Sequence, residues 1–186
     1  MNGSAAERLE QSLERRPALV GIGSRWHADD AAGPAVVARV SGRVAARCID
    51  AGDAPERHLG EVVASGAEVI LLLDAVDFGG APGELALFSC EELPDRLSTT
   101  HTSSLRLLMR YLEAESGADV LLVGMQPASV AFGKPMSAAV RATVDALAEL
   151  LEGKLGGAAP TALGPPVAPQ TPSARSQKGG HDYSWT

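Results

Sequence analysis

The sequence has few cysteines, no long apolar run and no excess of basic residues. Its two cysteines, Cys48 and Cys90, lack the CxxC spacing of a thiolate metal site and are too few for a disulfide framework. Lysine and arginine (16 residues) are outnumbered by aspartate and glutamate (23 residues), so no basic patch is available for nucleic acid. The longest apolar runs, such as 69–73 and 120–124, are far below the roughly 20 residues of a membrane span.

Two further absences bear on the setting in which the protein works. Residues 1–16 are charged and lack the apolar core of a secretory signal. The chain has no heptad repeat and no segment that predicts a large exposed apolar face. We therefore expect a cytoplasmic monomer with no nucleic-acid or membrane partner.

Composition divides the chain into three parts. Residues 1–16 are predicted to form an N-terminal helical extension, which begins after Ser4 and is ended by Pro17. Residues 17–155 are predicted to form one α/β domain, of a size that a single core can stabilise. Residues 156–186 contain five of the twelve prolines and five of the twenty glycines, with almost no apolar periodicity, and are expected to be a disordered tail.

Apolar runs alternate with amphipathic segments throughout residues 17–155. Strands are expected at 18–23, 47–50, 69–74, 84–90 and 119–125, and helices at 30–44, 55–64, 103–115 and 136–155. Continuous apolar strands separated by helices predict a three-layer α/β sandwich, with a mostly parallel, twisted five-stranded sheet between helices on both faces. Only about ten residues join the third and fourth strands, too few for a helical crossover, so one antiparallel edge pairing is expected.

Polar residues follow each expected strand, where ligands bind in open α/β sheets. The first strand is followed by Asp29 and Asp30, the second by Asp50 and Asp53, the third by Asp74 and Asp77, the fourth by His101 and the fifth by Gln126. Like charges gathered at one edge raise carboxyl pKa values or require a cation. The sequence therefore predicts an acidic site at this edge of the sheet.

Several of these residues could instead have ordinary structural roles. Asp29 or Asp30 could cap the following helix, which would leave the other free. Asp74 could stabilise a turn, and Asp50 and Asp53 are better explained as loop formers. The glycine turn at 21–23 is like a phosphate-binding loop, but it lacks the third glycine and is followed by carboxylates, which disfavours that reading.

Two carboxylates and one imidazole would suit a borderline divalent metal such as zinc, nickel or copper. An incomplete ligand set would leave positions open for water or for ligands from a partner.

Five sequence blocks, in order and at matching spacings over about residues 17–152, resemble the endopeptidases that mature the large subunit of nickel–iron hydrogenases. They are Gly21-Ile22-Gly23-Ser24 through Asp29-Asp30-Ala31-Ala32-Gly33-Pro34, Ile49 to Glu56, Leu73 to Phe78 with Pro82-Gly83-Glu84, Ser98 to His101, and Gly124 to Pro127 with Phe132 and Pro135-Met136. The chain departs from the family pattern at Ser24, where an asparagine is usual, and at Ala28 and Ala31, where glycines flank the acidic pair.

This resemblance implies three metal-binding positions, at Asp30, Asp74 and His101. It implies a protease that engages nickel already inserted in the large-subunit precursor and then removes a short C-terminal extension. Nickel would thus be presented by the substrate, and another divalent ion such as zinc or cadmium could occupy the isolated site.

Two mechanisms remain open at this stage. The metal could polarise the scissile carbonyl or activate water, or Asp30 or Asp74 could be the catalytic general base with a raised pKa. No Cys–His pairing and no GxSxG elbow is apparent, so the resemblance implies an aspartic-type or metal-assisted hydrolase.

Other functions would account for parts of the same pattern. A receiver-like signalling domain also has an acidic pair, a phospho-accepting aspartate, a hydroxyl residue and a lysine, which Asp29-Asp30, Asp74, Thr99 or Thr100, and Lys134 could imitate. The position of His101 and the long spacing before Asp29 argue against it. A third alternative is a chaperone that binds the large subunit without cleaving it.

Overall fold

The computed structural model describes residues 3–94 and 102–157, which fold around a five-stranded sheet of order β2-β1-β3-β5-β4. The strands are β1 (Pro17–Ile22), β2 (Arg47–Gly52), β3 (Val69–Ala75), β4 (Leu85–Phe88) and β5 (Asp119–Met125). Four strands run parallel, and β4 pairs antiparallel with β5 at one edge. This confirms the mostly parallel five-stranded sheet with one antiparallel edge strand.

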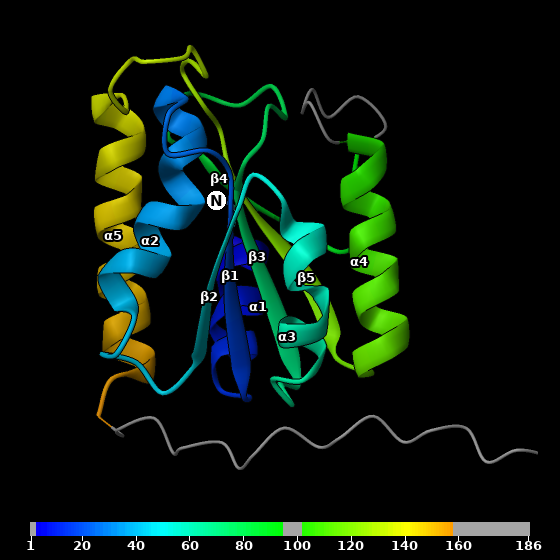
Figure 1. The fold of residues 1–186 in the computed structure, drawn as a ribbon. Helices are drawn as coiled ribbons and strands as arrows, with labels where there is room; N and C mark the ends of the chain where they lie inside the picture. Colours follow the sequence, from blue (N-terminus) through cyan, green and yellow to red (C-terminus); the bar gives the residue numbers. More distant parts are fainter. Residues whose placement is uncertain (1–2, 95–101, 158–186) are drawn as a thin grey trace, which may run out of the picture.

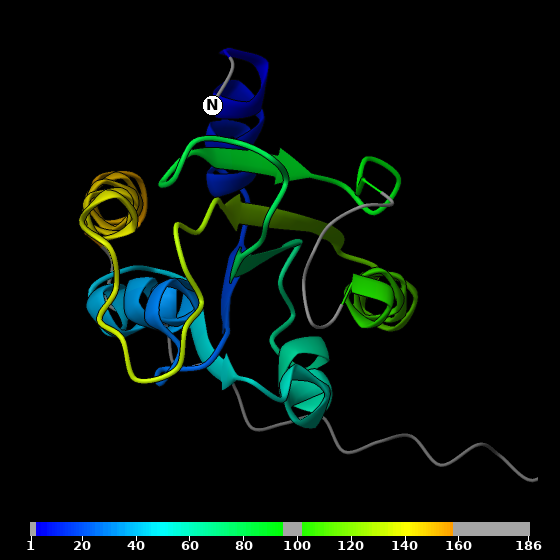
Figure 2. The same ribbon diagram turned by 90° about the horizontal axis from the view of Figure 1, so that it is seen from above.

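Helices cover both faces of the sheet (Figures 1 and 2). One face carries α1 (Gly3–Leu13), α2 (Ala32–Val40) and α5 (Ala138–Leu155), and the other carries α3 (Leu59–Val63) and α4 (Thr102–Ser116). Short 3-10 turns, η1 (Ala28–Ala31) and η2 (Pro55–His58), precede α2 and α3. The two helices predicted at 30–44 and 55–64 therefore each begin as a tighter turn, and α2 ends four residues earlier than expected, at Val40. The arrangement confirms the three-layer sandwich.

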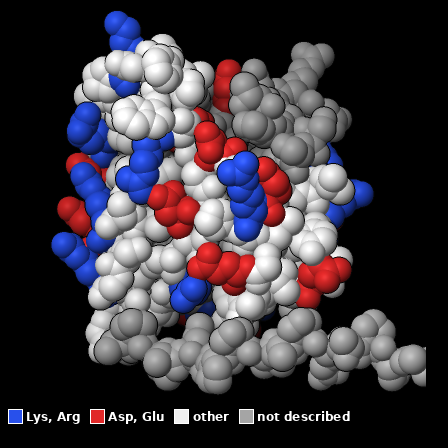
Figure 3. Space-filling model, viewed as in Figure 1, with Lys and Arg blue, Asp and Glu red and all other residues white. Residues whose placement is uncertain are grey.

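The surface of the described residues carries both signs of charge, and Figure 3 shows acidic and basic side chains interspersed over one face. Ion pairs join neighbouring elements there, such as Arg47 with Glu61 at 2.7 Å and Arg43 with Glu152 at 3.2 Å. Exposed pairs of this kind each stabilise a fold by only about 0–1 kcal/mol. The apolar core is therefore the main source of stability.

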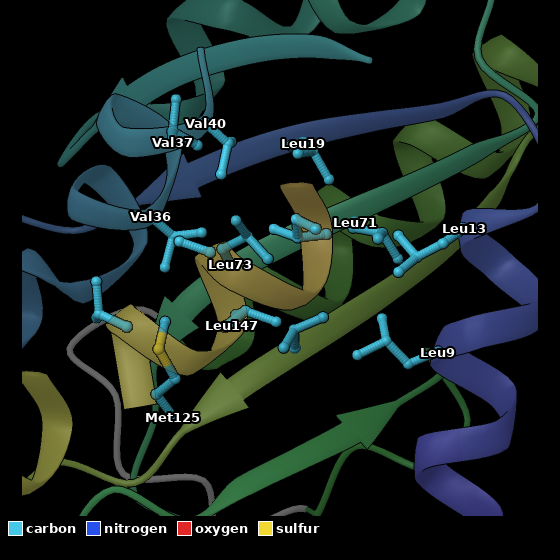
Figure 4. Packing of buried hydrophobic residues seen from close by; sticks show 14 of the residues in the cluster. Leu9, Leu13, Leu19, Val36, Val37, Val40, Leu71, Leu73, Met125 and Leu147 are labelled. Atoms are coloured by element: carbon cyan, nitrogen blue, oxygen red, sulfur yellow. The ribbon is translucent and has the colours of Figure 1, made fainter. Parts of the chain in front are cut away.

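The core has two halves, one on each face of the sheet, because successive residues of a strand point to opposite faces. On β3, Leu71 and Leu73 pack toward α2 and α5 (Figure 4), whereas Ile70 and Leu72 pack toward α3 and α4. The first half also contains Leu9 and Leu13 of α1, which are 1% and 3% exposed, so this helix packs on the sheet. The tail predicted from residue 156 lies outside the described residues from position 158 onward.

The direction of β4 changes the explanation for one part of the site. The sequence places residues 98–102 at the carboxyl edge of the sheet because they follow this strand. That reason is wrong, because β4 runs antiparallel and its last residue, Phe88, pairs with Leu122 near the middle of β5. The chain reaches the carboxyl edge again at the start of α4, which runs back along β5 (Figure 1). No helix in the described ranges is long and apolar enough to cross a membrane.

Candidate functional site

Three glycines allow the start of α2 to lie directly against the carboxyl ends of β1 and β3. A Cβ atom on Gly33 would lie 2.0 Å from the carbonyl oxygen of Leu73, and one on Gly21 would lie 2.7 Å from the carbonyl oxygen of Gly33. Gly23 has a φ of +124°, and a Cβ there would lie 1.9 Å from the carbonyl oxygen of Asp30. The glycine turn therefore serves close packing, and it brings the acidic pair next to the end of β3.

Asp30 and Asp74 line the same cavity at the carboxyl edge of the sheet. This cavity, which we call the aspartate cavity, has a volume of about 640 Å³ and is also lined by Asp53, Asp77, His27 and residues 127–130. Asp30 accepts a hydrogen bond from the backbone N–H of Ser24 at 2.6 Å, which fixes its carboxylate at the cavity wall. The structure thus brings together two of the three residues that the sequence predicts as metal ligands.

Asp74 is the more deeply buried of the two carboxyl groups, with 8% of its surface exposed. Burial raises the pKa of Asp74 well above its ordinary value, and the negative charge of Asp30 raises it further. A hydrogen bond from the backbone N–H of Ala75 acts in the opposite direction. The cavity therefore contains one carboxyl group that holds its proton to unusually high pH, beside a second carboxylate.

Asp29 has a different role from its neighbour. Its side chain is fully buried and accepts three backbone hydrogen bonds, from Ala128 at 2.8 Å, Ser129 at 3.1 Å and Ser137 at 2.6 Å. All three donors belong to the loop between β5 and α5. The sequence leaves open whether Asp29 or Asp30 caps the following helix, and in the structure neither side chain does so. Asp29 anchors a distant loop instead, and Asp30 lines the cavity.

Gln126 anchors another part of the cavity wall. Its side-chain oxygen accepts from the backbone N–H groups of Phe78 and Gly80, both at 3.0 Å, and its amide nitrogen donates to Asp77 at 3.0 Å. The bonds from Gln126 and from Gly79 lower the pKa of Asp77. Asp77 is thus ionised and hydrogen-bonded at the cavity mouth, in contrast to Asp74 inside.

The remaining residues of the predicted edge separate into two groups. Asp50 forms an ion pair with Arg25 and lies outside the aspartate cavity, as expected of a loop former. Asp53 lines the cavity, although the sequence analysis explains it as a loop former. His27 also lines it, and its ring contacts Phe132 edge to face with 5.3 Å between centroids. The sequence offers only one signal for His27, its place in the loop after β1.

His101, the third predicted ligand, lies outside the described residues. The neighbouring described position, Thr102, begins α4 at the carboxyl edge of the sheet. Within residues 3–94 and 102–157, no group of three His, Cys, Asp or Glu side chains is arranged to hold a metal ion. Asp30 and Asp74 thus supply two oxygen donors, and a metal would need further ligands from elsewhere.

Chemically, the cavity offers a carboxyl group with a raised pKa and a carboxylate beside it. A carboxyl group with a raised pKa can hold a proton and pass it to a reacting group, which is the task of general acid–base catalysis. The pair also attracts a cation, because a positive charge relieves the repulsion between the two groups. The described residues lining the cavity include no lysine or arginine that could supply that charge.

Comparisons with known proteins agree with this geometry. A family model described as hydrogenase maturation protease matches residues 35–154. A hydrogenase 3 maturation protease from Escherichia coli (strain K12) is 29% identical over 138 residues, which cover 73% of this chain and 88% of that protein.

Solved structures give the same result. The crystal structure of the NiFe hydrogenase maturation protease HycI from Thermococcus kodakarensis KOD1 superposes with a TM-score of 0.73 at 28% identity, covering 80% of this chain and 98% of that one. The solution structure of the endopeptidase HycI from Escherichia coli has a TM-score of 0.65 at 26% identity, covering 74% and 90%.

Proposed function

The chain belongs to the hydrogenase maturation protease family, and we propose that it removes a C-terminal extension from the large-subunit precursor of a nickel–iron hydrogenase after nickel has been inserted. In this proposal nickel is part of the substrate. The receiver-like alternative is set aside, because the family match spans most of the α/β domain.

The pairing of Asp30 and Asp74 in one cavity is the observation that carries the proposal. Two carboxyl groups at the end of parallel strands, without a lysine or arginine in the described cavity lining, favour a partner that brings a cation. A nickel ion held by the precursor would meet this requirement. A precursor without nickel would bring no cation to the two carboxyl groups, so its binding would be weaker.

The proposed ligand set consists of Asp30, Asp74 and His101, with the remaining positions filled by groups of the precursor. Carboxylate oxygens and an imidazole nitrogen are compatible with nickel, and also with zinc or cadmium in the isolated protein. An incomplete set supplied by the protease makes metal recognition depend on the substrate.

For the hydrolysis step, Asp74 is the better candidate for the general base. Burial and the charge of Asp30 raise the pKa of Asp74, so its carboxylate is a stronger base than an ordinary one. The oxygen of Asp74 that does not bind the metal would accept a proton from the attacking water and return it to the amine that leaves. Asp30, held by the backbone of Ser24, would hold the cation-bearing segment in place. The metal presented by the precursor would polarise the scissile carbonyl.

The experiment measures cleavage by intact mass, using nickel-loaded and nickel-free large-subunit precursor. We expect loss of the C-terminal extension from the loaded form only. Asp74→Asn and Asp30→Asn should each reduce the rate by at least about a hundredfold, on the scale of a lost general base. The matched control is Asp119→Asn, which alters an aspartate at the start of β5, at the opposite edge of the sheet, where it is paired with Arg15, and which should cleave normally.

Three outcomes would revise the proposal. Equal cleavage of both precursors would show that nickel is not recognised. Full activity of His101→Ala would remove that residue from the ligand set. Binding of the loaded precursor without any change in its mass would favour the non-cleaving chaperone.

A further inference from the structure

Large apolar side chains are exposed at two places among the described residues. Leu107 and Tyr111 lie on the outer side of α4. The other three gather in the loops beside the aspartate cavity: Trp26 is 72% exposed, Val130 is 52% exposed and Phe132 is 74% exposed. We call these three residues the apolar rim. None of these three side chains packs into the core, so they do not stabilise the fold by burial. A group of exposed apolar side chains of this kind indicates a binding surface.

Backbone contacts hold the two loops of the apolar rim together. The N–H of Gly133 donates to the carbonyl oxygen of Trp26 at 2.8 Å, and the ring of Phe132 contacts that of His27. The carboxylate of Asp29 binds the second loop on both sides of Val130 and Phe132, through residues 128, 129 and 137. The backbone that carries the apolar rim is therefore fixed before any partner arrives, which lowers the entropy lost on binding.

The apolar rim is continuous with the aspartate cavity. Val130 lines the cavity itself, and Trp26 lines a second groove of about 290 Å³ that shares Gly23, Ser24 and Asp53 with it. In Figure 3 the upper left of the molecule, where these loops lie in Figure 1, shows mostly uncharged side chains with some basic ones among them. The loops of the apolar rim also carry Arg25, which is ion-paired with Asp50, and Lys134. An acidic cavity thus opens directly beside an exposed aromatic surface.

We propose that the apolar rim binds an extended, apolar segment of the large-subunit precursor next to the segment that carries the metal. The inference rests on the proposed function and adds to it the surface that holds the polypeptide. Two neighbouring surfaces select this partner: the cavity favours a positive charge from outside, whereas the exposed side chains of Trp26, Val130 and Phe132 favour aliphatic side chains. A chain that presents a bound cation flanked by apolar residues matches both surfaces at once.

Trp26 and Phe132 are the expected main contributors to binding. Aromatic side chains on a rigid backbone bury a large area at a small entropic cost, and truncating such residues commonly weakens a complex tenfold or more. Both are already exposed, so their removal should leave the fold of the free protein unchanged. Their effect should therefore appear in substrate affinity rather than in stability.

The test uses the full chain and nickel-loaded precursor, with two separate readouts. Trp26→Ala and Phe132→Ala should each raise the Kd for the precursor about tenfold, raise KM in proportion and change kcat much less. Trp26→Phe should restore most of the affinity. Leu107→Ala is the matched control, because it removes an equally exposed apolar side chain on α4 and should leave Kd unchanged.

The two readouts separate failure of this inference from failure of the proposed function. If the wild-type chain binds the precursor but does not cleave it, the proposed function fails, and the Kd values of the variants still decide the role of the rim. An unchanged Kd in both alanine variants would overturn the inference while leaving the protease function intact. It would also be overturned if sedimentation shows a dimer of the free chain that Trp26→Ala dissociates, since the rim would then bind a second copy. Absence of any wild-type binding would refute both.

Discussion

Replacing Asp29 tests the explanation of how the cavity wall is held in place. This side chain is completely buried, yet it lies in the turn before α2 and binds a loop about one hundred residues later in the sequence. Asp29→Ala removes the acceptor of three backbone N–H groups at once. Asp29→Asn keeps one oxygen, which can still accept from Ala128 and Ser129, but turns an N–H₂ group toward the N–H of Ser137.

The magnitude follows from the number and type of bonds. A hydrogen bond to a charged acceptor contributes about 1.5–3 kcal/mol net, and the loop can shift toward water when the acceptor is lost. We therefore expect Asp29→Ala to lower the free energy of unfolding by about 3–5 kcal/mol. The loss in Asp29→Asn should be smaller, about 1.5–3 kcal/mol, because two of the three bonds can persist.

Urea unfolding measures these differences, and amide hydrogen exchange locates them. In Asp29→Ala, protection should fall most at Ala128, Ser129 and Ser137, whose N–H groups lose their acceptor. Asp50→Ala is the control, because it removes another aspartate of the same edge, whose interactions are an exposed ion pair to Arg25 and one long hydrogen bond of 3.3 Å from the backbone N–H of Gly52. Its effect should be below about 1 kcal/mol.

A loss of less than about 1 kcal/mol in Asp29→Ala, with unchanged exchange in the loop, would refute this reasoning. It would mean that the packing of residues 127–137 holds the loop without the carboxylate. Equal losses in the Asn and Ala variants would refute the narrower statement that two bonds survive in the amide.

Three further predictions concern the backbone and the buried carboxyl group. The pKa of Asp74 is raised in the folded state, so the contribution of this group to stability is most favourable below the ordinary carboxyl pKa of about 4 and is lost as pH rises toward the folded value. Asp74→Asn should therefore stabilise by about 1–3 kcal/mol at pH 7 and not at pH 4, and equal effects in urea unfolding at both pH values would contradict this. Ala28 has a φ of +42°, a conformation that is strained for a residue with a side chain. Ala28→Gly should therefore stabilise the fold by about 1 kcal/mol and raise Tm by about 2–4 °C. An unchanged or lower Tm would argue against strain at this position. Gly33→Ala would place a Cβ 2.0 Å from the backbone oxygen of Leu73 and should lower stability by about 3 kcal/mol or prevent folding. Gly60→Ala is the control, because it has open space around it and should change stability by less than about 1 kcal/mol. Similar effects of the two substitutions would show that α2 can move away from the sheet.

Much of the fold can be predicted because it depends on local patterns. The apolar run at 69–73 can only be a buried strand, and its central place in the sheet follows from having no polar face. The long helix α5 follows from apolar residues at helical spacing, with Ser137 as its N-cap. The partner of β4 could not be read from the sequence. Strand pairing depends on which neighbour has a free edge, and β5 covers the edge of β3 that β4 would need.

The candidate site, too, has features that the sequence predicts and features that it does not. Aspartates after parallel strands predict an acidic edge, and the residues around Asp30 and Asp74 carry the family resemblance by their order along the chain. The different roles of Asp29 and Asp30 could not be predicted, because both are acidic, adjacent and close to a helix start. Their hydrogen-bond partners differ only after β5 brings its following loop to the same edge.

By itself, the sequence determined the α/β architecture, the edge of the sheet where the acidic cavity lies and the family, because apolar periodicity and ordered motifs are local properties of the chain. Only the tertiary structure decided which aspartate anchors a loop, which carboxyl group is buried enough to have a raised pKa, and that Trp26, Val130 and Phe132 lie together. Each of these depends on segments distant in sequence being brought within van der Waals or hydrogen-bond distance. Burial and neighbouring charge exist only once that packing is complete.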